Sequence, residues 1–481
     1  VRPAVGPQAA VSGLDITLPG KPGSREQITS RVVGSIRREF PSRAECAINE
    51  LTASAAATAV TSLFGLRGPS VVADAACAGS FVALMLGAQA LHQGRVDMAF
   101  VGGAALRKWY ELVLIAQAGT MSSNGSCPFD ARADGLISSD GYATILIKTL
   151  ERAEADGDRI YGVIRGLGMS SDGRGKSFWA PRQDGQVAAI RRAYEGGLDP
   201  SRLQYIEAHA TSTRLGDAVE VRTLVEAFEP VLKQRVPIAS VKANIGHTLE
   251  TAGLAGLIKT LLAMEHGVIP PAINYQQPNP EINWDESPFY LPLQPEKWPE
   301  PEDGHPRRAG VNAFGVGGLN LHVVVDQYQD ANVSSSRLTV PAAGQAQLQS
   351  VRVKPEEEPE RPAIAVIGAG SLFPDAHTLD AFWELIASGR DPKAGVPIER
   401  WNPEVERRQL SLPISRNPNP YGGFITDFSF DWKKHKIPPK QIARSNPLQF
   451  MLLDAADQAL ADAGLGDDNF DRSRAGTVVG S

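Results

Sequence analysis

The sequence has little of what marks secreted, membrane or nucleic-acid-binding proteins. Its 481 residues hold three cysteines, too few and too scattered for a disulfide framework or a zinc knuckle. No run approaches the roughly 18 apolar residues of a membrane helix, and the first residues show no signal-peptide pattern. The 48 Lys and Arg against 54 Asp and Glu give a net charge of −6, which argues against binding to nucleic acid or to an anionic membrane. We therefore expect a cytoplasmic protein with no membrane span, no metal centre and no nucleic-acid partner.

What the sequence does contain is the alternation of an α/β protein. The 42% hydrophobic share is enough for a sizeable core, and the length suggests two or three domains. Short apolar runs alternate with amphipathic stretches. Strands are expected at residues 70–75, 98–104, 142–148, 161–167, 203–208, 237–241, 319–325, 363–370 and 475–480. Helices are expected at residues 81–93, 186–194, 254–265, 378–388 and 447–463.

The composition divides the chain into two structured blocks. Residues 327–362 are rich in Gln, Ser, Pro and Glu, which predicts a solvated linker between residues 1–326 and 363–481. The chain begins with Val1 and stops after an apolar run, so we interpret it as a piece of a longer protein. The glycines of Ile367-Gly-Ala-Gly-Ser-Leu-Phe-Pro favour a strand ending in a tight turn over a dinucleotide fingerprint, because the third glycine is missing.

A candidate nucleophile, Cys77, lies between an expected strand and an expected helix. Its neighbours are small (Asp74-Ala-Ala-Cys-Ala-Gly-Ser), so a sharp elbow there could present the thiol, and a helix N-terminus would favour the thiolate. Taken alone, a cysteine among alanines is more often a buried structural thiol. Cys46 and Cys127 have no comparable setting and are interpreted as inert.

Two histidines follow expected strands, where open α/β sheets collect their functional groups. His209 stands in Glu207-Ala-His-Ala-Thr-Ser-Thr, and His247 stands in Lys242-Ala-Asn-Ile-Gly-His-Thr. One such histidine would usually be structural. Two of them, with a cysteine elbow upstream and Lys242 nearby, favour a nucleophile-plus-imidazole site.

These segments resemble the β-ketoacyl synthases, the condensing enzymes of fatty-acid and polyketide assembly. The Cys77 block resembles the nucleophile motif of that family, and the two histidine segments resemble its two histidine motifs. Asn312-Ala-Phe-Gly-Val-Gly-Gly-Leu-Asn resembles its glycine-rich closing loop. One departure is Ala210, where the family usually has glycine. The added methyl could narrow the approach of the substrate arm.

The resemblance implies a thiolase-like layered αβαβα fold, with two mixed sheets from duplicated halves. It also implies an acyltransferase of the 3-oxoacyl-[acyl-carrier-protein] synthase type. Cys77 would take an acyl chain, and His209 and His247 would stabilise the enolate left when a malonyl unit loses CO2. Lys242 would tune the histidines. The N–H groups of Cys77 and Phe314 would form an oxyanion hole, with Phe314 also gating the acyl pocket.

The resemblance also implies the partners of the site. Substrates would arrive on the phosphopantetheine arm of an acyl carrier protein, held by Thr211 and Thr213, unless these threonines only cap a turn. No cofactor would be bound by the chain itself, and the synthase domains would pair as dimers. Two alternatives stay open: a thiolase-type acyltransferase, which needs a second catalytic cysteine, and a non-catalytic partner that sets chain length.

The second block, residues 363–481, resembles the opening of another such synthase. Its segments Phe382-Trp-Glu-Leu-Ile and Val396-Pro-Ile-Glu-Arg-Trp are typical of the N-terminal part of the domain, and the pattern is most like large iterative type I synthases of the polyunsaturated-fatty-acid kind. The chain would then span two tandem copies. We predict that 363–481 docks onto 1–326, with residues 363–368 between parallel partners, and that a single core results.

Overall fold

The computed structural model describes residues 54–107, 111–112, 115, 118–174, 180–301, 304–329, 362–397, 421–431, 433–435, 447–466 and 469–480. Cys46, most of the expected linker and Val396-Pro-Ile-Glu-Arg-Trp beyond residue 397 lie outside these residues. No helix among them is long and apolar enough to cross a membrane.

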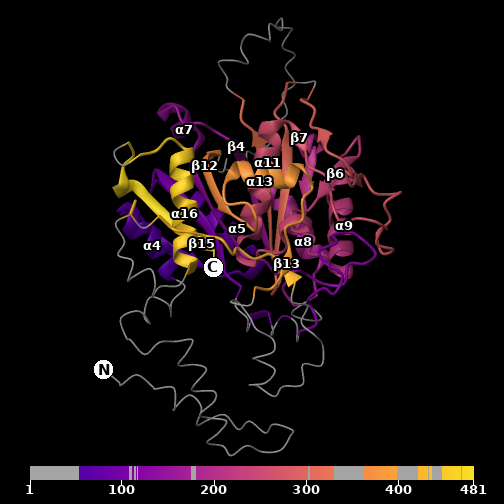
Figure 1. The fold of residues 1–481 in the computed structure, drawn as a ribbon. Helices are drawn as coiled ribbons and strands as arrows, with labels where there is room; N and C mark the ends of the chain where they lie inside the picture. Colours follow the sequence, from indigo (N-terminus) through magenta and orange to yellow (C-terminus); the bar gives the residue numbers. More distant parts are fainter. Residues whose placement is uncertain are drawn as a thin grey trace, which may run out of the picture.

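Eleven strands form one mixed sheet with two halves (Figure 1). The first half, in spatial order, is β1 (Ser70–Ala73), β15 (Ala475–Gly480), β2 (Met98–Ala105), β3 (Gly141–Thr149) and β12 (Ile364–Leu372). The second half is β4 (Gly162–Ser171), β11 (Leu319–Gln327), β10 (Arg308–Gly315), β5 (Tyr205–Glu207), β6 (Val236–Ala239) and β8 (Phe289–Tyr290). The halves are joined where residues 364–366 of β12 pair with residues 162–164 of β4.

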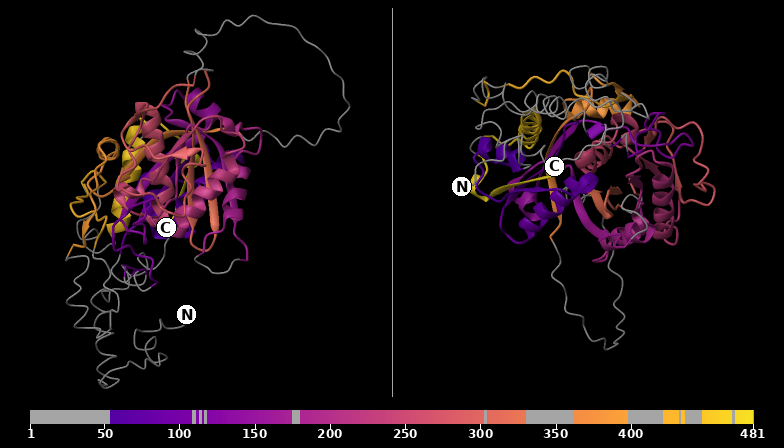
Figure 2. Two further views of the ribbon diagram at one scale, coloured as in Figure 1. Left: turned by 90° about the vertical axis from the view of Figure 1, so that its right-hand side faces the viewer. Right: turned by 90° about the horizontal axis from the view of Figure 1, so that it is seen from below.

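Helices cover both halves and fill the space between them, which gives five layers (Figures 1 and 2). One outer layer holds α16 (Pro447–Asp462) against β12 and β3, with α4 (Ser54–Phe64) beside it. The middle layer holds α5 (Gly79–His92) and α11 (Ala252–His266), and the other outer layer holds α8 (Gln183–Ala193) and α9 (Arg214–Phe228). The expected α/β layered class is confirmed.

The remaining elements are short. The helices are α7 (Leu150–Asp156), α10 (Lys242–Ile245) and α13 (Leu379–Ala387), with 3-10 turns at Ala76–Ala78, Pro200–Arg202, Leu249–Thr251 and Arg472–Arg474. Two small antiparallel pairs are β7 (Val268–Ile269) with β9 (Glu296–Lys297), and β13 (Ala394–Gly395) with β14 (Tyr421–Gly422).

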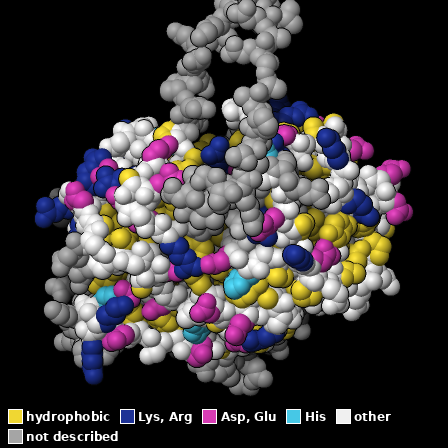
Figure 3. Space-filling view, turned by 90° about the horizontal axis from the view of Figure 1, so that it is seen from above, with side chains coloured by type: hydrophobic (Ala, Val, Ile, Leu, Met, Phe, Trp, Pro, Cys, Tyr) yellow, Lys and Arg dark blue, Asp and Glu magenta, His cyan; other side chains and the backbone are white. Residues whose placement is uncertain are grey.

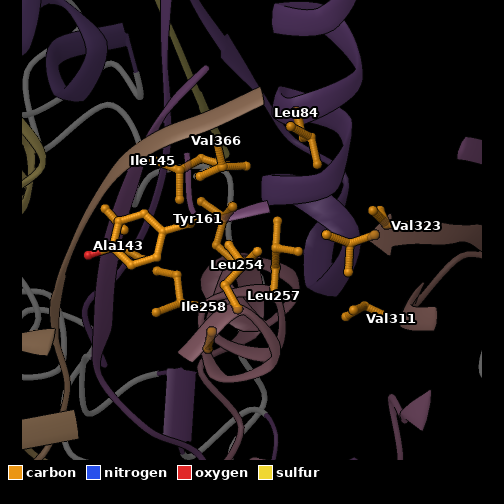
Figure 4. Close-up of a cluster of buried hydrophobic side chains, with 14 of the residues drawn as sticks. Leu84, Ala143, Ile145, Tyr161, Leu254, Leu257, Ile258, Val311, Val323 and Val366 are labelled. Atoms are coloured by element: carbon orange, nitrogen blue, oxygen red, sulfur yellow. The ribbon is translucent and has the colours of Figure 1, made fainter. Parts of the chain in front are cut away.

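The core centres on α11, whose residues from Ala252 to Met264 are all buried. Figure 4 shows Leu254, Leu257 and Ile258 of this helix among apolar side chains from both halves of the sheet. An apolar helix enclosed on every side is expected for a middle layer, since no face of it meets water. The position of α11 fixes the loop that precedes it, which contains His247.

The predicted docking of residues 363–481 onto 1–326 is confirmed by the strand ladders. β15 lies between β1 and β2, and β12 lies between β3 and β4. The partners of β15 are parallel, but those of β12 are antiparallel, so the expectation of parallel partners for 363–368 was wrong. Apolar faces on both sides show that a strand is central, but they do not specify the direction of its neighbours. The two blocks therefore build one core.

The face seen in Figure 3 bears acidic and basic side chains interspersed, with no broad basic patch. This distribution agrees with the small net negative charge of the chain.

Candidate active site

Cys77 stands in a strained elbow between β1 and α5. Ala76 has a φ of 47°, in the left-handed region that residues with a Cβ rarely adopt, and its N–H donates to Asp74 Oδ1 at 3.2 Å. The elbow rests on the end of β15, where a Cβ on Gly480 would lie 2.3 Å from the carbonyl carbon of Gly79. The second block thus supports the segment that presents the thiol, which is itself only 5% exposed.

The structure brings both predicted histidines to Cys77. His247 Nε2 lies 3.1 Å from the Cys77 sulfur, and the ring of His209 lies 5.5 Å from that of His247, nearly perpendicular to it. The Phe314 N–H donates to His209 Nδ1 at 3.3 Å, which leaves Nε2 as the protonated nitrogen of the neutral ring. His247 is held by its own N–H, which donates to the Ile137 carbonyl at 2.7 Å.

Burial sets the protonation of these three groups. It raises the pKa of the Cys77 thiol to about 11, with a further contribution from the Glu250 carboxylate. Burial also holds the pKa of both His209 and His247 well below the usual value, helped by the positive charge of Lys242. In the free site, burial thus favours a protonated thiol and two neutral imidazoles, and it opposes the thiolate that a helix N-terminus would favour.

Alkylation of Cys77 should report this raised pKa. Because the thiolate is the reactive form, the rate with iodoacetamide should rise about tenfold per pH unit from pH 7 to 10, without levelling off. The rate is measured by mass spectrometry of the Cys77 peptide, with a Cys127→Ser chain as the control for the other described cysteine. A plateau near pH 8 would contradict the burial argument.

Lys242 is the first residue of α10 and is 3% exposed. Burial lowers the pKa of its ammonium, while the carboxylates of Glu207 and Glu220 act in the opposite direction. Its charge in turn disfavours protonation of both His209 and His247. Lys242 is thus close enough to the two histidines for its charge to act on them.

Glu220 on α9 was not singled out by the sequence. Its Oε1 accepts hydrogen bonds from the His209 N–H at 2.7 Å and from Asn312 Nδ2 at 2.8 Å, and its Oε2 accepts one from the Ala210 N–H at 2.7 Å. One buried carboxylate thus holds the His209 loop against β10. The sequence did offer one indication of this role. Glu220 stands on the buried face of its helix, and a buried carboxylate needs hydrogen-bond partners.

Phe314, expected in a closing loop, is instead near the end of β10, which turns back into β11 through residues 316–318. Its ring lies 5.6 Å from that of His209. Its N–H is already bonded to His209 and is not a free oxyanion donor. The Val316 N–H, which the sequence did not indicate, bonds to the Cys77 sulfur and acts to lower its pKa.

The two threonines lie at the edge of the site. Thr211 and Thr213 are half-buried, with their hydroxyl oxygens 3.3 Å apart. Thr213 is the N-cap residue of α9, but its hydroxyl does not bond to a helix N–H, so the capping alternative is not observed. Ala210 is 1% exposed and packs with apolar residues beneath the loop, so its methyl does not narrow the approach to the site.

The second block also supports the His247 loop. Lys393 is 6% exposed, and its Nζ donates to the carbonyls of Ala243 at 2.6 Å and Asn244 at 2.7 Å. Nothing in the sequence indicated this contact, because about 150 residues separate the partners. On the other side of Cys77, buried Arg107 bonds to Glu250 at 2.9 Å.

Family models match most of the chain. The N-terminal domain of β-ketoacyl synthase matches residues 12–153 and 361–481, and the C-terminal domain matches residues 161–276. The ketoacyl-synthetase C-terminal extension matches residues 278–354. The matched regions include the elbow, both histidine loops and the whole of the second block.

Known proteins of similar sequence are polyketide synthases. The highly reducing polyketide synthase acrA of Aspergillus aculeatus is 41% identical over 293 residues, covering 58% of this chain and 12% of that protein. Polyketide synthase PksL of Bacillus subtilis is 39% identical over 279 residues, covering 57% of this chain and 6% of that protein. The chain thus spans a small fraction of these curated relatives.

A solved structure supports the same relationship. The ketosynthase from module 6 of the bacillaene synthase of Bacillus subtilis 168 is 38% identical, with a TM-score of 0.56 over 57% of this chain and 51% of that one. With the fold, the Cys77–His247 contact and the family matches in agreement, the chain belongs to the β-ketoacyl synthase family.

Proposed function

We propose that the chain is a condensing enzyme that joins an acyl group on Cys77 to a malonyl unit in polyketide or fatty-acid synthesis. The observation that supports this most strongly is the 3.1 Å contact between the Cys77 sulfur and His247 Nε2, with the His209 ring beside it. One thiol and two neutral imidazoles match the two half-reactions of a decarboxylative Claisen condensation.

In the first half-reaction, Cys77 receives the acyl group. The thiol transfers its proton to His247 as the sulfur attacks the acyl-carrier thioester, because the pKa of the isolated thiol is too high for it to ionise alone. The carrier thiol leaves and takes up a proton, and the acyl group remains as a thioester on Cys77. The Cys77 N–H is placed to bind the developing oxyanion. The Phe314 N–H can donate to the same oxyanion only after it breaks its 3.3 Å hydrogen bond to His209 Nδ1.

In the second half-reaction, a malonyl thioester loses CO2. The electron pair of the broken bond passes into an enolate. Its oxygen accepts hydrogen bonds from His209 Nε2–H and from His247, which carries its proton on Nε2 once the acylated sulfur no longer donates to that atom. The enolate carbon then attacks the Cys77 thioester, and the cysteine sulfur leaves as a thiolate that takes up one proton from water. The product is a β-ketoacyl thioester on the carrier. Burial, and after it the charge of Lys242, holds the pKa of both histidines well below the usual value, so that they donate hydrogen bonds as neutral rings near pH 7.

The partners follow from this chemistry. Thr211 and Thr213, half-buried beside His209, would hydrogen-bond the phosphopantetheine arm of an acyl carrier protein. Phe314 would gate the acyl pocket from its position against His209. The proposed setting of the reaction is a multifunctional enzyme in the cytoplasm.

A dimer is supported by the edge of the sheet. Among the described strands, β1 is the terminal one and pairs with β15, and its Val71 is 40% exposed. An exposed apolar edge directly before the nucleophile elbow is suited to pairing with the same strand of a second copy.

We also retain the proposed division into a synthase domain lacking its N-terminal part (1–326), a linker (327–362) and the N-terminal part of a second synthase domain (363–481). It is supported by the N-terminal family model, which matches on both sides of the linker. β11 extends to Gln327, so the first boundary falls a residue or two later than the composition suggested.

The alternatives receive less support. A thiolase-type acyltransferase needs a second catalytic cysteine near the C-terminal loop, and the only described cysteine besides Cys77 is Cys127. Cys127 contacts Asn124 and Ser212. A non-catalytic chain-length partner would not need the histidines gathered at a thiol.

The test is a sequential reaction followed by intact-mass measurement. With an acyl-carrier thioester alone, the chain should gain one acyl group on Cys77. Addition of malonyl carrier should then remove that mass, release CO2 and yield a β-ketoacyl carrier. An acyl group that stays on Cys77 after malonyl carrier is added would indicate a non-condensing partner.

A further inference from the structure

A buried ion pair lies behind the two histidine loops. Lys259 Nζ, in the middle of α11, is 2.7 Å from Glu207 Oε2 on β5, and the two side chains are 1% and 2% exposed. Burying two charges costs more than a surface pair, so an isolated pair in the middle layer is a poor source of stability. Its geometry indicates another role.

Glu207 connects the segments that present the active-site groups. Its Oε1 accepts the Val241 N–H at 2.6 Å, and Oε2 also accepts the Tyr205 hydroxyl at 2.6 Å. Val241 immediately precedes Lys242, and Glu207 itself stands two residues before His209. One carboxylate therefore ties the strand that ends at His209 to the segment that begins with Lys242.

The facing helix is shaped to admit this carboxylate. Gly256 of α11 lies against Glu207, and a Cβ added there would be 3.0 Å from Glu207 Cγ. Three positions further, Lys259 Nζ also lies 5.8 Å from the centre of the Tyr205 ring. The helix thus leaves room for the glutamate at one turn and supplies its counter-charge at the next.

The charges around Lys242 come from every element packed against it. Glu207 on β5 and Glu220 on α9 favour its positive charge, as does any negative charge on Cys77, whereas Lys259 on α11 opposes it. The histidines His209 and His247 face the same ammonium. Among these groups Glu207 gives the largest favourable contribution to the charged form of Lys242.

We infer that Glu207, charge-balanced by Lys259, is a positioning residue that fixes Lys242 beside the histidines. The inference rests on the proposed condensing function for its catalytic meaning, but the charge of Lys242 can be measured without any turnover. Glu207 acts through Lys242 and the Val241 backbone, and it touches no reacting atom.

The test is a pair of variants that should shift the titration midpoint of Lys242 in opposite directions. Glu207→Gln retains a hydrogen-bond acceptor for the Val241 N–H but removes the negative charge, so the titration of Lys242 should move down by roughly one pH unit. Lys259→Met removes a like charge, so the same titration should move up. Both are followed by NMR of chain labelled with ¹³C at the lysine ε-carbon, with Lys242→Met identifying the resonance.

A double variant keeps the test valid if either single variant folds poorly. Glu207→Gln/Lys259→Met leaves no unpaired buried charge and should recover the thermal stability lost in the single variants, while Lys242 still titrates below its wild-type midpoint. The matched control is Asp158→Asn, which removes a partner of buried Lys148 at the end of β3 remote from the Cys77 elbow. It should lower stability without moving the Lys242 titration.

Activity supplies a second readout. If the chain decarboxylates malonyl carrier, its activity should be lost at high pH. In Glu207→Gln the pH of half-loss should move down by the same amount as the NMR midpoint of Lys242. A wild-type chain that does not decarboxylate would refute the proposed function, while the titrations still decide the present inference. An unchanged Lys242 midpoint in both Glu207→Gln and the double variant would overturn it.

Discussion

Replacing Cys77 with alanine should abolish acyl loading and lower condensation by roughly four decades or more, the scale on which loss of a catalytic nucleophile acts. No other described thiol lies at the histidines, because Cys127 contacts Asn124 and Ser212 instead. The measurement is the intact mass of the chain after incubation with an acyl-carrier thioester, together with the yield of β-ketoacyl product.

The Cys77→Ala substitution should leave the fold intact. Cys77 is flanked by alanines in a short turn, so alanine fits the same elbow and the melting temperature should change little. Cys127→Ala is the matched control and should load normally. A Cys77→Ala chain that still carries an acyl group would remove Cys77 from the mechanism.

Replacing His247 with alanine should lower malonyl decarboxylation by two decades or more, as expected for loss of an oxyanion donor. Loading should also slow, by roughly a hundredfold, because His247 Nε2 is the group in contact with the thiol, but it should stay measurable. The two half-reactions are measured separately, as CO2 release and as adduct formation on Cys77.

His209→Ala separates the roles of the two rings. His209 accepts a hydrogen bond from the Phe314 N–H and does not contact the Cys77 sulfur. Its loss should therefore reduce decarboxylation as strongly as His247→Ala does, while the rate of acyl loading should change only a fewfold. His266→Ala, which removes a ring stacked on Trp383 away from Cys77, should affect neither step. Normal decarboxylation in His247→Ala would exclude this residue from enolate stabilisation.

Much of the fold could be predicted from local patterns. The expected strands at 98–104 and 142–148 became β2 and β3, and the helix at 254–265 became α11, because long apolar runs specify both the element and its burial. The hairpin of β10 and β11 was missed, because Asn312–Gly315 was interpreted as a loop. Its glycines occupy the turn, whereas the residues before them gain ladder bonds from β11 that no local pattern reveals.

The sequence by itself indicated which residues of this protein meet in the site. Cys77, His209, His247 and Lys242 stand in short motifs after expected strands, and the resemblance of these motifs to those of a known family identified the set before any coordinates. Apolar faces on both sides of residues 363–368 likewise indicated that the second block must enter the same core.

Only the tertiary structure decided how those residues are charged and held. Burial raises the pKa of the thiol, and burial is a property of the whole packed layer. Glu220, Lys393 and the Glu207–Lys259 pair support the site through contacts between residues up to 150 positions apart. Such contacts leave no local signature, because each partner satisfies its polar atoms with groups that the fold brings to it.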